Sequence, residues 1–171
     1  CVDLLLPAPA NLHSHAFQRA MAGLAEARGP QAGDDNSHDS FWTWRDIMYR
    51  FLERLGPEDV ESIAAFAQME MLEAGFAAVA EFHYLHHQPD GTPYEDIAEM
   101  AARIGAAATT TGIGLTLLPV LYQQGGTDGR ALAGGQRRFG NDLDQYARLV
   151  DTAAAALGSL PGDTVTGAAI H

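Results

Sequence analysis

The sequence alternates short apolar runs with longer segments in which apolar residues recur at helical spacing, and no other feature restricts the fold as strongly. Strands are predicted in the residues that lead into His13 and at 76–85, 113–122 and 164–171. Helices are predicted at 15–27, 41–55, 56–75, 93–112 and 142–158. Apolar strands separated by amphipathic helices indicate a parallel sheet covered by helices, which places the chain in the α/β class.

Proline and glycine mark several of these boundaries. Pro57 stands where the first turn of a helix tolerates proline, and Gly75 and Gly112 stand where helices are expected to end. Two stretches rich in glycine and polar residues, 28–40 and 123–141, are predicted to be loops. No short repeat or low-complexity tract is present, and the composition, 47% hydrophobic and 19% charged, suits one globular unit with a core.

The ends of the strands distinguish two folds that share this alternation, a doubly wound open sheet and a (β/α)8 barrel. Each apolar run finishes in an imidazole or a phenol: His13 and His15, His83 and Tyr84, Tyr122, and His171. In a barrel, the carboxyl ends of the strands surround one pocket, so polar groups collected there indicate an active site. A dinucleotide-binding sheet would need a glycine-rich phosphate loop after its first strand, and the sequence has none there. We therefore predict the first half of a (β/α)8 barrel.

The two ends of the chain suggest that it is a piece of a longer protein. The chain begins with Cys1 and finishes on an apolar, strand-like run, 164–171, with no turn after it. An apolar edge strand left exposed invites mispairing. We expect residues 1–171 to form part of a catalytic barrel, about strands 1 to 4 with their helices, with the remainder missing.

Charge and cysteine content exclude several classes of partner. Lysine and arginine total 10 against 22 aspartate and glutamate, a formal net charge of −12, which argues against binding to nucleic acid or to an anionic membrane surface. No apolar run approaches the ~20 residues that span a bilayer, and no signal peptide is visible. With a single cysteine there is no disulfide framework, so a cytoplasmic location is expected.

His13 and His15 are candidate metal ligands. Residues two apart on a strand point to the same face, so both imidazoles could reach one ion, whereas on a helix they would lie on nearly opposite sides. The pattern is short, and the alternative is a pair of ordinary polar loop residues.

Five segments carry a resemblance to a known family. They are NLHSHAFQRAMAGLAE (11–26), DSFWTWRDIMYRF (39–51), AEFHYLHHQPDGTPY (80–94), GIGLTLLPVLY (112–122) and GQRRFGND (135–142). In this order they resemble the formimidoylglutamate deiminases, metal-dependent amidohydrolases of histidine degradation. The likeness runs from about Pro9 to His171. It departs from the family pattern in two places. PAPA (7–10) stands where a Pro-Gly usually leads into the histidine pair, and the loop after the third strand, YQQGGTDGRALAGG, differs.

The resemblance implies hydrolysis of N-formimino-L-glutamate to N-formyl-L-glutamate and ammonia, with a small molecule as the binding partner. It also implies one zinc ion per chain, or another divalent metal, held by His13 and His15 together with a later histidine and aspartate. Such a zinc lowers the pKa of bound water toward ~7. The full-length protein is expected to be a homodimer.

By the same resemblance, Gln18, Arg45, Tyr84 and His171 line the substrate pocket. A substrate derived from glutamate carries two carboxylates, and a guanidinium can bind one of them through two hydrogen bonds. Each residue has an ordinary alternative. Gln18 would be a surface residue, Arg45 a solvated or stacked helical arginine, Tyr84 a core aromatic and His171 a plain strand end.

Two further groups are interpreted as structural. His83, His86 and His87 could suggest a second metal cluster, but strand-end and loop positions explain them, and Glu70 and Glu73 are expected on a solvated helix face. Two other functions remain open. One is a related deaminase that acts on a guanidino, amidino or aminopurine substrate, and the other is a non-catalytic half-barrel that keeps the histidine pair as a relic.

Overall fold

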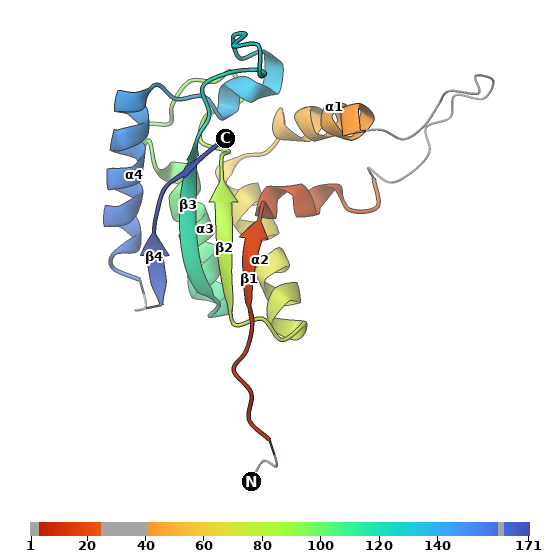
Figure 1. The fold of residues 1–171 in the computed structure, drawn as a ribbon, viewed down its shortest axis with the longest axis vertical. Helices are drawn as coiled ribbons and strands as arrows, with labels where there is room; N and C mark the ends of the chain where they lie inside the picture. The colour runs from red at the N-terminus through yellow and green to blue at the C-terminus, as the bar shows by residue number, and fades with distance from the viewer. Residues whose placement is uncertain (1–3, 25–40, 161–162) are drawn as a thin grey trace, which may run out of the picture.

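Four parallel strands lie side by side in chain order in the computed structural model, which describes residues 4–24, 41–160 and 163–171 (Figure 1). The strands are β1 (Ala10–Ser14), β2 (Ala78–His83), β3 (Gly114–Leu121) and β4 (Thr164–Thr166), and the short β5 (Ala169–Ile170) continues beside β3. All pairings are parallel. Neighbours in sequence are therefore neighbours in the sheet, which is the order of a barrel and not of a doubly wound sheet.

The helices lie on one side of this sheet and at one end of it. They are α1 (Phe41–Leu52), α2 (Pro57–Glu73), α3 (Glu99–Thr111) and α4 (Leu143–Leu157), with the 3-10 helices η1 (Ala16–Met21) and η2 (Gly134–Arg138). In Figure 1, α2 and α3 lie behind the strands and α4 flanks β4. The upper end of the figure, where the strands finish, holds α1 and η1.

Burial along β2 shows which face the helices cover. Val79, Glu81 and His83 are buried, while the residues that alternate with them are only partly buried. A strand covered on both faces would be buried at every position. Within the described residues, the second face carries no helix (Figure 1).

Most predicted boundaries agree with the structure to within a few residues. Pro57 opens α2, and Asp142 precedes α4 and accepts a hydrogen bond from the backbone N–H of Gln145 at 2.7 Å. Gly112 ends α3 with a φ of 77°, a left-handed conformation that glycine adopts without strain. The predicted strand 164–171 is confirmed as two short pieces. The loop predicted at 28–40 lies outside the described residues.

Two helix predictions were wrong in part. Of the helix expected at 15–27, the described residues form only the six-residue 3-10 helix η1. The helix expected at 93–112 begins at Glu99, because Asp96 forms a turn before it. The Asp96 side chain accepts from the N–H of Ala98, and its carbonyl accepts from the N–H of Glu99.

One buried guanidinium joins α1 to the segments beside it. Arg138, on η2, is 0% exposed and donates to the carbonyl oxygens of Leu52, Leu55 and His87, the last two at 2.9 and 2.8 Å. Its own carbonyl accepts from the N–H groups of His86 and His87. Leu52 is the last residue of α1, so this cation satisfies one of the carbonyls that the helix leaves without partners.

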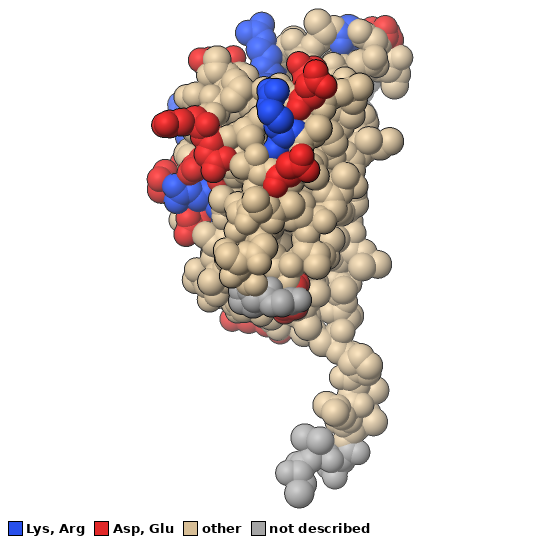
Figure 2. All heavy atoms as spheres, turned by 90° about the vertical axis from the view of Figure 1, so that its left-hand side faces the viewer, with Lys and Arg blue, Asp and Glu red and all other residues tan. Residues whose placement is uncertain are grey.

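The surface seen from the α4 side is of mixed charge. Figure 2 shows acidic and basic side chains interspersed over the upper part of this face, with no continuous basic area in view. Among the described residues, no helix is long and apolar enough to cross a bilayer. The absence of a nucleic-acid partner stays a prediction.

Replacing Arg138 should test how strongly the fold depends on this cation. A lysine keeps the charge but cannot reach three carbonyls with a planar fork, so Arg138→Lys should lower the free energy of unfolding by about 3 kcal/mol. Urea unfolding of full-length protein measures this. The control is Arg137→Lys at the exposed neighbouring position, with an expected change within about 0.5 kcal/mol. Equal losses of unfolding free energy in the two variants would contradict the stabilising role assigned to Arg138.

Candidate active site

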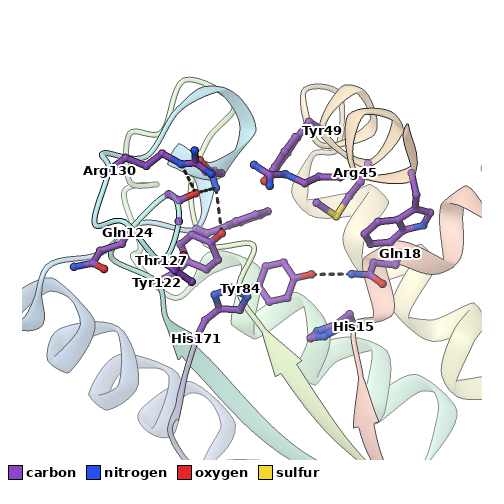
Figure 3. A pocket seen from close by; sticks show the side chains of 16 residues that line it. His15, Gln18, Arg45, Tyr49, Tyr84, Tyr122, Gln124, Thr127, Arg130 and His171 are labelled. Atoms are coloured by element: carbon purple, nitrogen blue, oxygen red, sulfur yellow. Dashed lines mark hydrogen bonds between the residues drawn. The ribbon is translucent and has the colours of Figure 1, made fainter. Parts of the chain in front are cut away.

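A cavity of about 790 Å³ lies at the carboxyl ends of the strands, where the barrel fold places active sites (Figure 3). Aromatic and polar side chains from η1, α1, the strand ends and the loop after β3 line it. The lining residues are His15, Gln18, Trp44, Arg45, Met48, Tyr49, Tyr84, Tyr122, Gln124, Gly125, Gly126, Thr127, Arg130, Gln136, Phe139 and His171.

The structure brings together residues that the sequence analysis chose from distant parts of the chain. Gln18, Arg45, Tyr84 and His171 all line this one cavity, and His15 lines it beside them. The binding role of each stays a prediction. His13 is not part of the lining. It is exposed, and its ring lies 4.4 Å from the ring of Phe82, centroid to centroid.

The His13 and His15 side chains converge. Their Nε2 atoms are 3.1 Å apart. Two imidazoles bound to one tetrahedral zinc at ~2.0–2.1 Å would have their nitrogens ~3.3 Å apart, so the pair fits a shared metal ion with little movement. Within the described residues no third histidine, cysteine or carboxylate completes a group of three. The pair alone therefore makes half of a four-ligand site.

A backbone contact fixes the orientation of the His15 ring. Its Nδ1 donates to the carbonyl oxygen of Phe82 at 2.9 Å, which leaves Nε2 as the nitrogen that carries the lone pair. Burial lowers the pKa of His15, and the nearby His13 lowers it further. The ring therefore stays neutral near pH 7, the form that binds metal.

Tyr84 and Gln18 form a hydrogen-bonded pair in the cavity wall. The side-chain N–H of Gln18 donates to the hydroxyl oxygen of Tyr84 at 2.7 Å (Figure 3). Burial raises the pKa of the Tyr84 phenol, so it keeps its proton. Because the oxygen accepts from Gln18, the hydroxyl hydrogen can be donated to a ligand.

Two guanidinium groups reach over the cavity from opposite sides (Figure 3). Arg45 extends from α1, with its guanidinium carbon 5.3 Å from the ring centroid of Tyr49. Arg130 comes from the loop after β3, and its Nε donates to the carbonyl of Gly125 at 3.1 Å. Gly126 packs so closely that a side chain there would strike the Arg130 guanidinium. Two cations on facing walls suit a ligand with two negative groups.

His171 is placed by stacking. Its ring lies 4.4 Å from that of Tyr122 at an interplanar angle of 26°, and its backbone N–H donates to the carbonyl of Leu121. Tyr122 in turn accepts a hydrogen bond from the Gln136 side chain at 3.3 Å.

Sequence reasoning missed five polar residues of the cavity: Tyr49, Gln124, Thr127, Arg130 and Gln136. Four of them lie in the loop at 123–141, which was predicted only as a loop. Its place after a strand, at the carboxyl end of the sheet, was the signal that could have identified it.

His83, His86 and His87 do not line the cavity. They are 1–2% exposed, and the neighbouring ring centroids are 5.2 and 5.9 Å apart. His86 hydrogen-bonds to the carbonyl of Val120, and His87 to that of Gly140. Their interpretation as structural residues stays a prediction.

Glu70 is partly exposed, as expected of a solvated helix face, and it also forms an ion pair. Its carboxylate binds Arg19 through two hydrogen bonds of 2.5 and 2.7 Å, and both side chains are 38% exposed. The partner is on η1, which packs against α2 and turns this helix face into an interface. Glu73 is exposed, as expected.

Comparison with known proteins gives a close relative. Over 153 residues, 90% of this chain, the sequence is 55% identical to formimidoylglutamate deiminase of Pseudomonas aeruginosa. Over most of its own length, the chain is therefore similar to a formimidoylglutamate deiminase. It spans about a third of its relative's length, 32%. No protein-family profile matches the chain.

Solved structures agree on the fold. An amidohydrolase from Brucella melitensis superposes with a TM-score of 0.87 at 54% identity, and the match covers 96% of this chain and 35% of that one. Two structures of low identity show the fold alone. Guanine deaminase from C. acetobutylicum has a TM-score of 0.65 at 11% identity, and triazine hydrolase from Arthobacter aurescens has 0.69 at 17%. They cover 96% of this chain and 32% and 34% of their own. The predicted barrel class is confirmed.

The buried histidines should make the protein sensitive to acid. Burial lowers the pKa of His83 to about 4, from 6.5. Between these values the unfolded chain binds a proton that the folded protein does not. The free energy of unfolding therefore falls as the pH drops from 6.5 to 4, by about 3 kcal/mol in total.

His83→Gln removes this group, so its unfolding free energy should fall less than that of the wild type between pH 7 and about pH 4.5. Urea unfolding of metal-free, full-length protein at both pH values measures the difference. Groups common to both proteins cancel in this comparison. If the unfolding free energies of wild type and His83→Gln fall equally, His83 does not resist protonation in the folded protein.

Proposed function

We propose that this chain supplies the substrate pocket and half of the metal site of an enzyme that hydrolyses N-formimino-L-glutamate to N-formyl-L-glutamate and ammonia. The observation that carries the proposal is the single cavity in which His15 meets Gln18, Arg45, Tyr84 and His171. The name of the Pseudomonas aeruginosa relative supports it. Water adds across the carbon–nitrogen double bond of the formimino group, and the terminal nitrogen leaves as ammonia.

His13 and His15 would hold a zinc ion, because their converging Nε2 atoms and the neutral state of His15 suit a metal ligand pair. When bound, zinc supplies Lewis acidity and lowers the pKa of a water molecule toward ~7. Phe82 keeps the His15 ring in place through its carbonyl group.

Arg45 and Arg130 would bind the two carboxylates of the substrate. Each guanidinium offers a planar pair of donors, and the two lie on facing walls of the cavity. A substrate whose two carboxylates are both bound has its formimino group held at a fixed position near the carboxyl ends of the strands. Such fixed placement of the reacting group is a large part of catalysis.

Tyr84 and His171 lie between these cations and His15 (Figure 3). The Tyr84 hydroxyl, oriented by Gln18, would donate a hydrogen bond to the substrate. His171 would donate to, or accept from, the group that reacts or a carboxylate.

The chain would act as part of a longer polypeptide, since its relatives are about three times its length. The remaining metal ligands and the group that moves protons would come from the rest of that polypeptide. We therefore expect residues 1–171 alone to release no ammonia from the substrate and to aggregate through the uncovered sheet face. A cytoplasmic, homodimeric enzyme belongs to the same proposal.

Removal of either histidine should abolish the reaction. We expect the full-length protein to bind about one zinc per chain, the stoichiometry of a single such site, and His13→Ala or His15→Ala to release no ammonia. Chelator-treated wild type should be inactive and recover when zinc is added back. Full activity of a metal-free preparation would disprove the proposal.

Replacing Arg45 tests recognition of the substrate. Arg45→Lys keeps the charge but loses the planar pair of N–H donors that can bind one carboxylate. The kcat/KM for N-formimino-L-glutamate should therefore fall by the equivalent of about 1–3 kcal/mol. Arg50→Lys, an exposed position on the same helix, is the matched control and should leave kcat/KM unchanged. If kcat/KM is the same for the two variants, Arg45 does not bind the substrate and is an ordinary solvated arginine of the helix.

A panel of substrates separates this function from its alternatives. Ammonia release from N-formimino-L-glutamate should exceed release from a guanidino acid or an aminopurine under the same conditions. Preference for one of these would identify a different deaminase, and no turnover of any would favour a barrel without catalysis.

A further inference from the structure

The histidine pair lies on an irregular piece of strand. The register of β1 on β2 runs from Asn11 opposite Val79 to Ser14 opposite Glu81, so β1 contains one residue more than β2 over this span. Such a bulge bends a strand and redirects its side chains, and bulges are frequent beside active sites. The Asn11 side chain accepts from the backbone N–H of His13 at 3.1 Å. The geometry of the pair therefore depends on what holds the bulge.

Glu81 lies against this bulge. Its carboxylate accepts a hydrogen bond from the backbone N–H of Ala16 at 2.7 Å, and the Ser14 side chain interacts with the same carboxyl group and lowers its pKa. Ser14 separates the two histidines and Ala16 follows the second, so one carboxylate holds the chain on both sides of His15. The side chain is 3% exposed, and burial raises the pKa of its carboxyl group to about 7.

The next residue of β2 holds the rings. The Phe82 carbonyl accepts from His15, and the Phe82 ring packs against His13. Adjacent residues of one strand thus position the two histidines by complementary means, Glu81 through the backbone and Phe82 through the imidazoles. Neither residue lines the cavity.

We propose that Glu81 is a positioning residue for the His13–His15 pair, which holds the bulge of β1 in the form that brings the two Nε2 atoms within reach of one metal ion. The inference rests on the proposed metal site. An apolar residue at position 81 would leave the N–H of Ala16 without its partner, and an aspartate would fall one methylene short.

The test is metal affinity in the full-length protein, measured with zinc against a chromogenic chelator. Groups that orient metal ligands typically contribute 10–100-fold to affinity, so Glu81→Asp should bind zinc at least about tenfold more weakly than wild type. Glu81→Gln keeps an oxygen that can accept from Ala16 and should stay within about threefold. Glu70→Asp, on the neighbouring helix, is the matched control and should bind as wild type.

A second readout separates positioning from a general loss of stability. Cobalt bound in place of zinc has a visible absorption spectrum that reports on ligand geometry. Glu81→Asp should change that spectrum, and Glu81→Gln should restore it. A residue that only supports the fold would lower the melting temperature of the metal-free protein and leave cobalt affinity and spectrum unchanged, and that result would overturn the inference.

The remaining outcomes are also decisive. If Glu81→Asp does not fold, Ser14→Ala, which removes one of the two contacts, takes its place. It should weaken zinc binding, and unchanged affinity would overturn the inference. If the wild type itself binds no zinc, the proposed function fails. If the wild type binds zinc and the position 81 variants bind it equally well, only the role of Glu81 fails.

Discussion

The cavity exists because one buried guanidinium holds its walls together. Arg138 joins the end of α1, the residues after β2 and the 3-10 helix η2 through three carbonyl groups. α1 carries Trp44 and Arg45 on one wall, and the η2 segment carries Gln136 and Phe139 on another. A cation away from water is costly unless its donors are satisfied, and the Leu52 carbonyl, at the negative end of the α1 dipole, is a suitable acceptor. The distance between the walls therefore depends on contacts outside the cavity.

The parallel order of the strands and most helix limits followed from the sequence alone, because they depend on local patterns. Apolar runs alternate with amphipathic ones, and Pro57 and Gly112 stand where the backbone requires them. The errors came from local turns that compete with helix formation, which the periodicity of apolar residues does not describe. Asp96 forms a turn with its own neighbours and delays α3, and the segment after His15 forms a 3-10 turn.

The same distinction holds for the site. Strand ends are visible in a sequence, so polar residues such as Tyr84 and His171 could be expected near one pocket. Their assignment to the substrate pocket, like that of Gln18 and Arg45, came from the family resemblance. Contacts made by the loop after β3 depend on its three-dimensional path, which Gln136 fixes through the carbonyl of Gly125 and the hydroxyl of Tyr122. Nothing in the order of residues 123–133 indicates that Arg130 would point back toward the strand ends.

Trp44 gives the cavity an optical probe of its own. Its indole forms part of the cavity wall beside Arg45, on the helix that Arg138 anchors. A molecule that enters the cavity replaces water against this ring, so the intensity and wavelength of its emission report occupancy. The chain has two tryptophans, Trp42 and Trp44, and with phenylalanine at position 42 Trp44 would be the single source of the signal within these residues. Ligand binding can then be followed separately from any reaction, with compounds that do not react.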